Sequence, residues 1–379
     1  MDAKKILPFV IFLFAECSNT TSIDSITTID VQKAYDHTNS ISLSEFSTNE
    51  IEYIALETHP DGLFTFGKMY AFDKYIVVQS FPRILLFDRQ TGKFIRQITR
   101  QGSDYNQFTG FHHTYFVNEN SLTLSFPDIL GGIEYDFEGN VVRKIRFPDK
   151  DARLKFFPLD EKRYAVFRLN TGNDADKLYI VDYDGNELNR FPNNHSYDAT
   201  KGVDNNFGFI ASKWNNNIIF YENFVDTLYQ ITNNNDIIPY YHIYLGKYQP
   251  PYSEKPFFFI SRNPERPLSM DYIMIYSISE SDKFLFFSFT HDKKDRRWTR
   301  RGFEGMPVSR YFGFYDKQSG NTKIAEEDQK DKSPVINDID NFATIYPFYM
   351  TINQCNEMTT YIEAEDIVEW FIKNPEKSQ

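Results

Sequence analysis

Cysteine is scarce in this 379-residue chain, which contains only Cys17 and Cys355. Two cysteines exclude a framework of several disulfides and a zinc site built from four cysteines. The sequence also lacks the Gly-x-Ser-x-Gly elbow of many hydrolases, the Walker phosphate-binding loop and the glycine fingerprint of dinucleotide-binding proteins. No such motif indicates a reaction, although a catalytic triad stays open because its members need not be close in sequence.

Long hydrophobic runs and an excess of positive charge are also missing. Outside residues 6–15, no apolar run approaches the roughly 18 residues of a membrane-spanning helix. The formal net charge is −12, which argues against a general binder of nucleic-acid phosphates. Hydrophobic residues nevertheless make up 41% of the chain and aromatic residues 17%. Aromatic side chains suit the pleated, half-buried surfaces of β-sheets, so the composition favours a β protein with a large core.

The first residues have the pattern of an export signal. Lys4 and Lys5 precede an apolar run over residues 6–15, which is too short for a permanent membrane helix. The sequence FAEC that ends at Cys17 resembles a bacterial lipobox, which would make this cysteine the lipidated first residue of the mature protein. Glu16 departs from that pattern, because a small residue usually stands there. The alternatives are ordinary cleavage after Cys17 and a buried N-terminal strand.

Residues 18–40 are rich in Ser, Thr, Asn and Asp, a composition that predicts a polar tether. With Cys17 lipidated or removed, Cys355 remains alone, and we expect it to be a buried small hydrophobe. The predicted parts of the chain are therefore a signal peptide (1–17), a tether (18–40), a folded domain (41–372) and a polar tail (373–379).

A hairpin pattern recurs through the body of the chain. An apolar or aromatic strand ends in Asp, a turn containing Gly follows, and a second strand leaves the turn. The copies end at Asp88, Asp136, Asp182 and Asp316, and a degenerate copy at Gln230 has asparagines in place of the glycine. Successive copies from Asp88 to Gln230 are 46 to 48 residues apart, and 86 residues separate Gln230 from Asp316. Such a period is typical of propeller blades with four strands.

The repeat predicts an all-β fold, a six-bladed β-propeller of four-stranded antiparallel blades. The predicted blades are 64–99, 108–147, 153–191, 207–245, 270–325 and 336–370. The last of them is short of an outer strand, which we expect residues 50–56 to supply. The ring would then be closed by pairing of the N- and C-terminal segments, which leaves no long sheet edge unpaired.

Several segments are similar to a known family. They are IEYIALE at 51–57, LFD to FI at 86–95, DTLY at 226–229, PY to LGK at 239–247, and NDID to Pro at 337–347. In this order they resemble the extracytoplasmic six-bladed propellers of Bacteroidetes, relatives of NHL-type and TolB-like propellers. The resemblance covers about residues 41–370 and implies an envelope location but no single reaction. It departs at 102–108, where DYNQ replaces the family's Gly-Pro-Gly-Glu, so no role of that turn is carried over.

Two groups of residues, three histidines and a pair of aspartates, are of the kinds that bind metal ions. His195, His242 and His291 are spaced at close to the blade period, but they fall at different positions within their repeats. We therefore expect independent histidines rather than a shared set of ligands. Asp338 and Asp340 lie two residues apart, on one face if the segment is a strand. This pair could bind calcium, or it could belong to a solvated turn before the last blade.

The most basic segment is HDKKDRRWTRR at residues 291–301, inside an otherwise acidic chain. It interrupts the expected hairpin, which predicts a long exposed loop. Its candidate ligand-binding residues are Arg296, Arg297, Trp298, Arg300 and Arg301. Arginines attract anionic lipids, polymers or proteins, and a Trp can stack on a sugar or base. The alternative is a loop tip that only aids solubility.

These observations favour a binding module over an enzyme. We expect an exported, lipid-anchored propeller of the periplasm or outer membrane that presents one face to an envelope protein, a peptide or a glycan. We expect it to be a monomer that binds no nucleic acid and needs no cofactor. The alternative is a calcium-dependent hydrolase or lyase of the lactonase-like propeller type, with its metal on the ring axis. A purely structural role in the envelope is a third interpretation.

Overall fold

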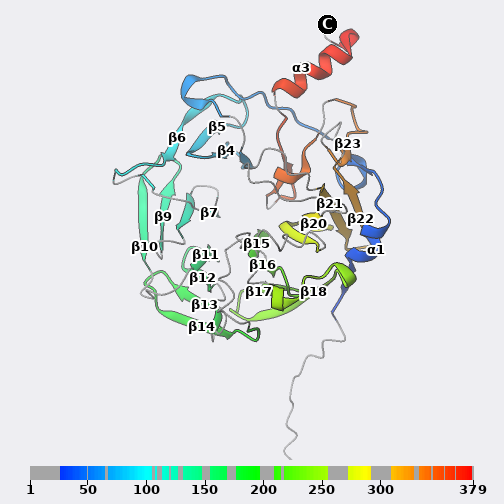
Figure 1. Ribbon diagram of the computed structural model, residues 1–379. Helices are drawn as coiled ribbons and strands as arrows, with labels where there is room; N and C mark the ends of the chain where they lie inside the picture. Colours follow the sequence, from blue (N-terminus) through cyan, green and yellow to red (C-terminus); the bar gives the residue numbers. More distant parts are fainter. Residues whose placement is uncertain are drawn as a thin grey trace, which may run out of the picture.

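Sheets arranged around a common centre dominate the computed structural model (Figure 1). It describes residues 26–377 apart from 49, 65–66, 105–106, 109–112, 119–120, 127–130, 147–153, 169–175, 197–208, 215–216, 255–271, 292–308, 328–332, 343–344, 354 and 363. Within these residues, five sheets each contain four consecutive antiparallel strands, and one of the five gains a further strand at its edge. This is the architecture of a β-propeller, which confirms the all-β propeller fold that the repeat predicts.

We number these sheets as blades 1 to 5 in chain order. Blade 1 contains β3 (Lys68–Ala71), β4 (Tyr75–Ser80), β5 (Arg83–Asp88) and β6 (Phe94–Arg100). Blade 2 contains β7 (His113–Asn118), β8 (Ser121–Phe126), β9 (Gly131–Asp136) and β10 (Val141–Arg146). Blade 3 contains β11 (Leu154–Pro158), β12 (Arg163–Arg168), β13 (Asp176–Asp182) and β14 (Glu187–Pro192).

Blade 4 contains β15 (Phe209–Trp214), β16 (Asn217–Glu222), β17 (Thr227–Ile231) and β18 (Ile237–Tyr244). Blade 5 contains β19 (Met274–Glu280), β20 (Phe284–His291), β21 (Ser309–Asp316) and β22 (Thr322–Glu326). Short 3₁₀ helices are η2 (Leu43–Glu45), η3 (Pro60–Gly62), η7 (Gly246–Tyr248), η8 (Tyr252–Glu254), η9 (Pro347–Tyr349) and η10 (Pro375–Lys377). The five blades fall within a few residues of the first five predicted ranges.

The region predicted as a sixth blade is built differently. Among the described residues it forms two small sheets: β23 (Val335–Ile336) pairs in parallel with β2 (Ile41–Ser42), and β24 (Thr351–Ile352) pairs with β25 (Met358–Thr359). The chain then forms helix α3 (Ala364–Lys373), which projects beyond the ring (Figure 1). Residues 50–56 form no strand, contrary to the prediction; they lie along blade 1, where Ile54 and Leu56 pack against its apolar face.

The segment predicted as the end of a tether is part of the fold. Strand β1 (Thr28–Asp30) pairs in parallel with β18 as a fifth strand of blade 4, and helix α1 (Val31–Asp36) follows at once. The Asp30 side chain caps this helix by accepting a hydrogen bond from the Lys33 backbone N–H, at 2.8 Å. Ile29, Val31 and Tyr35 are at most 1% exposed. The prediction of a polar tether through residue 40 is therefore wrong for residues 28–36, because three large side chains there enter the core.

The repeated aspartates shape their own turns. The carboxylate of Asp182 accepts hydrogen bonds from the backbone N–H groups of Asp184 and Asn186, at 3.0 and 2.8 Å. The side-chain amide of Asn186 also donates to this carboxylate, at 2.8 Å, and it lowers the pKa of Asp182 most. The two backbone bonds lower the pKa further. Gly185 adopts φ = 86°, and Asn235 takes the left-handed conformation at φ = 68° in the degenerate copy, as predicted. The repeat is therefore a run of turns that each specify a hairpin locally.

The residue after each turn aspartate contacts the preceding part of the ring. Phe137 of blade 2 packs edge-on against Tyr75 of blade 1, with ring centroids 5.7 Å apart. In blade 3, Tyr183 lies under the guanidinium of Arg143 from blade 2, at 3.6 Å. In blade 5, Lys317 lies 4.9 Å from the ring of Trp214 in blade 4.

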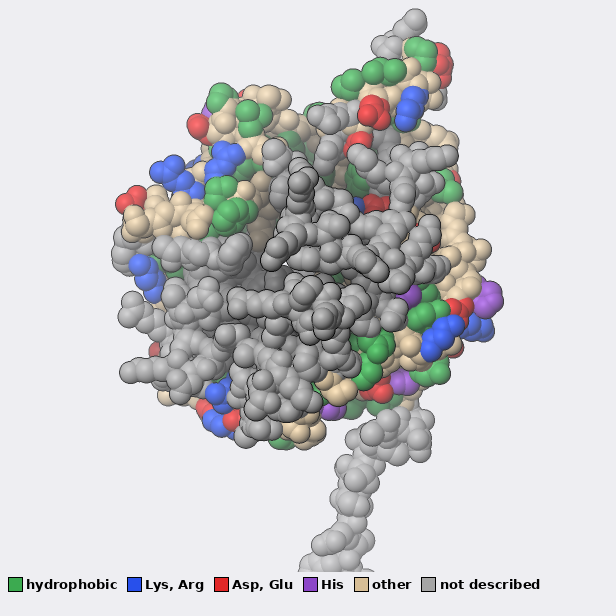
Figure 2. Space-filling view, in the orientation of Figure 1, with side chains coloured by type: hydrophobic (Ala, Val, Ile, Leu, Met, Phe, Trp, Pro, Cys, Tyr) green, Lys and Arg blue, Asp and Glu red, His purple; other side chains and the backbone are tan. Residues whose placement is uncertain are grey.

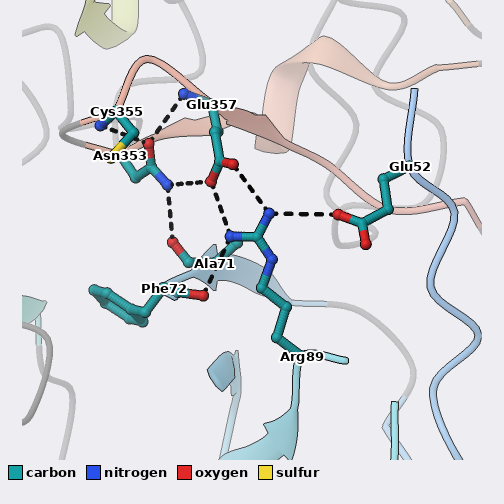
Figure 3. A network of polar contacts seen from close by, with 7 residues as sticks. All are labelled: Glu52, Ala71, Phe72, Arg89, Asn353, Cys355 and Glu357. Carbon is teal, nitrogen blue, oxygen red and sulfur yellow. Dashed lines mark hydrogen bonds and ion pairs between the residues drawn. The ribbon is translucent and has the colours of Figure 1, made fainter. Parts of the chain in front are cut away.

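Arg89 holds the equivalent position in blade 1, and its partner comes from the far end of the chain (Figure 3). Its two terminal nitrogens donate to the carboxylate of Glu357 at 2.9 and 3.0 Å, and one also donates to the carbonyl of Phe72 at 3.2 Å. Asn353 braces the same turn: its amide donates to Glu357 at 2.7 Å and to the Ala71 carbonyl at 3.3 Å. The β24–β25 hairpin is thus fastened to the end of β3.

Substitutions at two glycines would test the packing of residues 54–57 against blade 1. Gly92 and Gly320 both have positive φ, 67° and 72°, but a Cβ on Gly92 would lie 2.0 Å from the Ala55 carbonyl oxygen, whereas one on Gly320 meets nothing within 4 Å. Gly320→Ala should cost about 1 kcal/mol of unfolding free energy from backbone strain. Gly92→Ala should cost about 2 kcal/mol more, measured by urea unfolding, because the backbone must move. Equal losses would contradict this packing.

The Arg89–Glu357 pair should make stability depend on pH. The hydrogen bond from Arg89 lowers the pKa of Glu357 below its ordinary value. A lowered pKa stabilises the fold above the ordinary carboxyl pKa of about 4.3, and that contribution is lost as the pH falls through the folded value. Arg89→Ala should cost about 1–2 kcal/mol at pH 7, and the difference from wild type should shrink toward pH 3.

The matched control is Arg190, whose side chain is 53% exposed and bonds Glu187 and Asp176 within blade 3. Arg190→Ala should cost less than about 1 kcal/mol at pH 7, since exposed pairs contribute little. We call the Arg89–Glu357 pair the clasp. If Arg89→Ala costs no more stability than Arg190→Ala, the clasp does not hold the two ends of the chain together.

Candidate binding face

The two ends of the blades are built from connections of different length. At one end lie the turns that join the first strand to the second and the third to the fourth, such as 72–74, 89–93 and 281–283. At the other end lie the connections from the second strand to the third and from one blade to the next. We call these the short-turn end and the long-loop face. The strand ends that border residues 169–175, 193–208, 245–273 and 292–308 lie on the long-loop face.

Contacts between blades 3, 4 and 5 show that neighbouring long-loop ends lie side by side. The Lys177 ammonium, near the start of β13, is 2.6 Å from the carboxylate of Glu222 at the end of β16. The next residue, Asn223, is 1% exposed and pairs with the backbone of Ile275 in both directions, at 2.7 and 3.0 Å. These polar contacts are buried and satisfied, so they fix the frame of the face.

The basic segment leaves this face from a buried aromatic cluster. His291 ends β20 and is 6% exposed, and its Nδ1 lies 2.5 Å from the hydroxyl of Tyr35, with which it shares a hydrogen bond. Edge-on ring contacts join Tyr35 to Tyr248 and Tyr311, at 4.9 and 5.1 Å between centroids. Phe289 stacks on Tyr311 at 4.9 Å. We call these five side chains the loop root.

Electrostatics keep the loop root neutral at its centre and charged at its edge. Burial raises the pKa of Tyr311 to about 12, and burial also raises the pKa of Tyr35, so both phenols stay protonated. At the edge, Tyr248 donates to the carboxylate of Asp36 at 2.6 Å, which lowers the pKa of that group. The Lys247 ammonium lies 3.5 Å from the same carboxylate. The root is therefore a rigid mount on which α1, η7 and blade 5 meet.

The sequence did not single out the loop root, although His291 was among the candidate histidines. Tyr35 and His291 are 256 positions apart, and no short motif links them. The predicted ligand residues Arg296, Arg297, Trp298, Arg300 and Arg301 lie outside the described residues, as does Cys17. Figure 2 shows Lys, Arg, Asp and Glu interspersed around the rim of this view among the residues drawn in colour. The structure places His291, the first residue of the basic segment, and Ser309, where β21 begins, on the long-loop face.

The carboxylates of Asp338 and Asp340 contact groups of the N-terminal segment. Asp338 accepts hydrogen bonds from the Ser44 hydroxyl and backbone N–H, at 2.5 and 3.0 Å, and these bonds lower its pKa. Asp340 accepts from the Tyr53 hydroxyl at 2.8 Å and from the Asn337 amide at 2.7 Å. Burial and the bond to Asp340 raise the pKa of Tyr53 to about 12. Both carboxylates therefore act as acceptors that join residues 44–53 to the C-terminal part.

The three spaced histidines contact different groups. The ring of His195 stacks on Tyr252 at 4.8 Å. His242 lies between the Thr28 hydroxyl, at 3.3 Å from its Nδ1, and the carboxylate of Asp226, at 3.4 Å from its Nε2. Within the described part of the chain, no cluster of three His, Cys, Asp or Glu has the arrangement of a metal site. Cys355 is exposed, contrary to the expectation of a buried thiol, because it lies on the β24–β25 turn.

The arrangement of blades and connections defines the class of the protein as a β-propeller. Over residues 26–379 the chain matches the family described as a domain of unknown function, DUF4934, and it belongs to that family. No curated protein matches it. No helix among the described residues is long and apolar enough to cross a membrane.

Three solved structures are similar to the chain at low sequence identity. A Bacteroides fragilis protein described as a presumed exported protein is 14% identical, with a TM-score of 0.54 over 79% of this chain and 80% of that chain. A member of the DUF4221 family from Bacteroides vulgatus is 10% identical, with a TM-score of 0.49 over 72% and 84%. A streptogramin B lyase is 10% identical, with a TM-score of 0.40 over 80% and 91%. At these identities no activity carries over, and the relation to NHL-type and TolB-like propellers stays a prediction.

Removing the hydroxyl of Tyr35 tests whether its hydrogen bond to His291 stabilises the loop root. Tyr35→Phe keeps the buried ring but removes the hydrogen bond to His291, so it should lower the unfolding free energy by about 1–2 kcal/mol. Tyr248→Phe, which loses only a bond at the surface, should cost less than about 1 kcal/mol. Chemical denaturation measures both. Limited proteolysis should also cut the basic segment sooner in Tyr35→Phe, and unchanged stability and cleavage would refute a structural role for this bond.

Proposed function

We propose that this protein is an exported, lipid-anchored propeller that captures an acidic protein, peptide or glycan of the cell envelope on its long-loop face. The observation that carries the proposal is the one-sidedness of the connections. The turns at the short-turn end are held by hydrogen bonds to their own aspartates, whereas the strand ends that border the longer connections lie on the opposite face. Proteins commonly place binding residues on such connections above a rigid scaffold.

The charge of the basic segment supports an acidic ligand. The chain has a net charge of −12, yet residues 291–301 contain Lys and Arg at six positions. Clustered arginines favour carboxylates and sulfates, and they also speed the encounter with an acidic partner. The buried loop root supports this interpretation, because a solubilising tip would not need a mount of five packed rings.

We also infer that the ring has six blades. Alternate residues of β5 face two different neighbours: Ile84 and Leu86 pack with blade 2, while Leu85 and Phe87 pack with Ile54 and other residues of the chain ends. Strand β24 contacts both β3 and β19. The Arg89–Glu357 clasp repeats the contact that joins other blades. These contacts support the terminal segments as the sixth blade, closing the ring between blades 5 and 1.

The N-terminal residues support export and anchoring. The basic and apolar order of residues 4–15, followed by Cys17, is typical of a lipoprotein signal. Several acyl chains on this cysteine would hold the protein stably at a membrane. Cys17→Ser should move the protein from the membrane to the soluble fraction of cells if the cysteine is the anchor.

The binding proposal is tested by removing the charge of the basic segment. A variant with Arg296, Arg297, Arg300 and Arg301 replaced by Gln should bind an acidic probe, heparin, at least tenfold more weakly by calorimetry. The matched control replaces four exposed lysines in turns of the short-turn end, Lys74, Lys93, Lys162 and Lys283, by Gln and should bind as wild type. Equal weakening in both variants would reduce the effect to net charge. Unchanged binding in the first variant would remove the segment from the site.

A second experiment tests the alternative function, a calcium-dependent enzyme. Thermal unfolding of the wild-type protein is compared in calcium and in chelator, because a ligand at a hundred times its Kd adds about 2.7 kcal/mol of stability. We expect no shift, since Asp338 and Asp340 already accept hydrogen bonds from Ser44 and Tyr53. A calcium-dependent rise would favour the hydrolase or lyase over the binding module.

A further inference from the structure

We infer that the anchored protein stands with the rim of blade 4 next to the lipid surface, which keeps the long-loop face clear of the membrane. This inference rests on the proposed N-terminal anchor and concerns how that anchor orients the ring. It depends on where the described chain first joins the fold and on the direction in which it arrives there.

The chain is fixed to the outer strand of blade 4 from residue 27 onward. The His242 backbone N–H donates to the carbonyl of Thr27 at 3.0 Å, and β1 then pairs with β18 from Thr28 to Asp30. Ile29 and Val31 are fully buried beyond this point. Separating the segment from the ring would expose these side chains, so thermal motion does not release it.

This attachment shortens the tether. From Cys17 to Thr27 an extended chain spans at most about 35 Å, at 3.3–3.6 Å per residue. A tether that continued to residue 40, as the composition suggests, would span about 80 Å. The anchor therefore restrains the ring near the bilayer instead of letting it turn freely.

The direction of β1 decides which surface is near the lipid. Because β1 runs parallel to β18, it runs from the short-turn end toward the long-loop face. The chain upstream of Thr28 thus approaches from the short-turn side along the rim. In Figure 1, β18 and α1 lie on the opposite side of the ring from β5 and β6 of blade 1. Blade 4 is consequently close to the anchor, and blade 1 is far from it.

The exposed side chains of β18 suit the interface between lipid headgroups and water. Ile238 is 41% exposed and Tyr244 is 43% exposed, and a bulge between Pro239 and Tyr241 puts them on opposite faces of the strand, so each side of the rim carries one of them. Tyr side chains are favoured at membrane interfaces, because their rings are apolar and their hydroxyls reach water. Anionic headgroups would repel a chain with a net charge of −12, so an uncharged headgroup is the expected neighbour.

The test uses energy transfer from the protein to the bilayer. Residues 17–379 carry a histidine tag in front of residue 17 and bind phosphatidylcholine vesicles that contain nickel-chelating lipid and an acceptor dye. In a Cys17→Ser, Cys355→Ser background, a donor is attached through Ile238→Cys or through Ile95→Cys. Ile95 is the matched control: like Ile238 it is the second residue of an outer strand, it is 37% exposed, and it belongs to blade 1.

We expect at least twofold more efficient transfer from position 238 than from position 95. Inserting about twenty Gly and Ser residues before residue 26 should remove the difference, because the ring can then turn. Equal transfer with the natural tether, or more transfer from position 95, would overturn the inferred orientation. Both variants should keep the wild-type unfolding midpoint. The tag replaces the lipid, so a failure of Cys17 lipidation in cells would refute the natural anchor without affecting this result.

Discussion

The structure depends on one constraint: a blade has two apolar faces, and each must be covered by a neighbour. In β5, consecutive buried residues such as Leu85 and Leu86 belong to different apolar clusters on opposite sides of the sheet. Burying only one face would leave the other in water at a cost of several kcal/mol. Each blade is therefore packed between neighbours, and a closed ring, as we propose, covers the last free face as well. The same constraint explains why residues from both chain ends, including Ile54 and Tyr361, cover the free face of blade 1.

The sequence allowed prediction of those blades whose hairpins are locally determined. Each turn has an Asp that accepts its own backbone N–H groups and a Gly or Asn with positive φ, so a short motif carries the signal. The region predicted as a sixth blade lacks that motif, and among the described residues it forms two small sheets instead of a four-stranded one. The sequence did not predict the segment β1–α1, which we call the strap, for another reason. Its composition is polar, and the partners of Ile29 and Tyr35 are more than 200 positions away.

The candidate site divides in the same way. Composition identified the basic segment, since six positive charges in an acidic chain are visible without a fold. Nothing local to the segment could show that it leaves a buried mount made of α1, η7 and blade 5. Asp338 and Asp340 show the opposite case, in which a pattern typical of a cation site serves as a pair of acceptors for the N-terminal chain. Residue types alone do not separate the two uses; their partners do.

The parallel pairing of β1 with β18 has a mechanical consequence. An anchored protein that is pulled by a partner transmits the load through its N-terminal chain. The strap resists this load with interstrand hydrogen bonds that share it in shear, and with the buried Ile29, Val31 and Tyr35 behind them. Tyr35 in turn is bonded to His291, at the base of the segment that we assign to ligand capture. With the anchor and the capture face that we propose, the Tyr35–His291 pair would connect the segment that carries the load to the segment that holds the ligand.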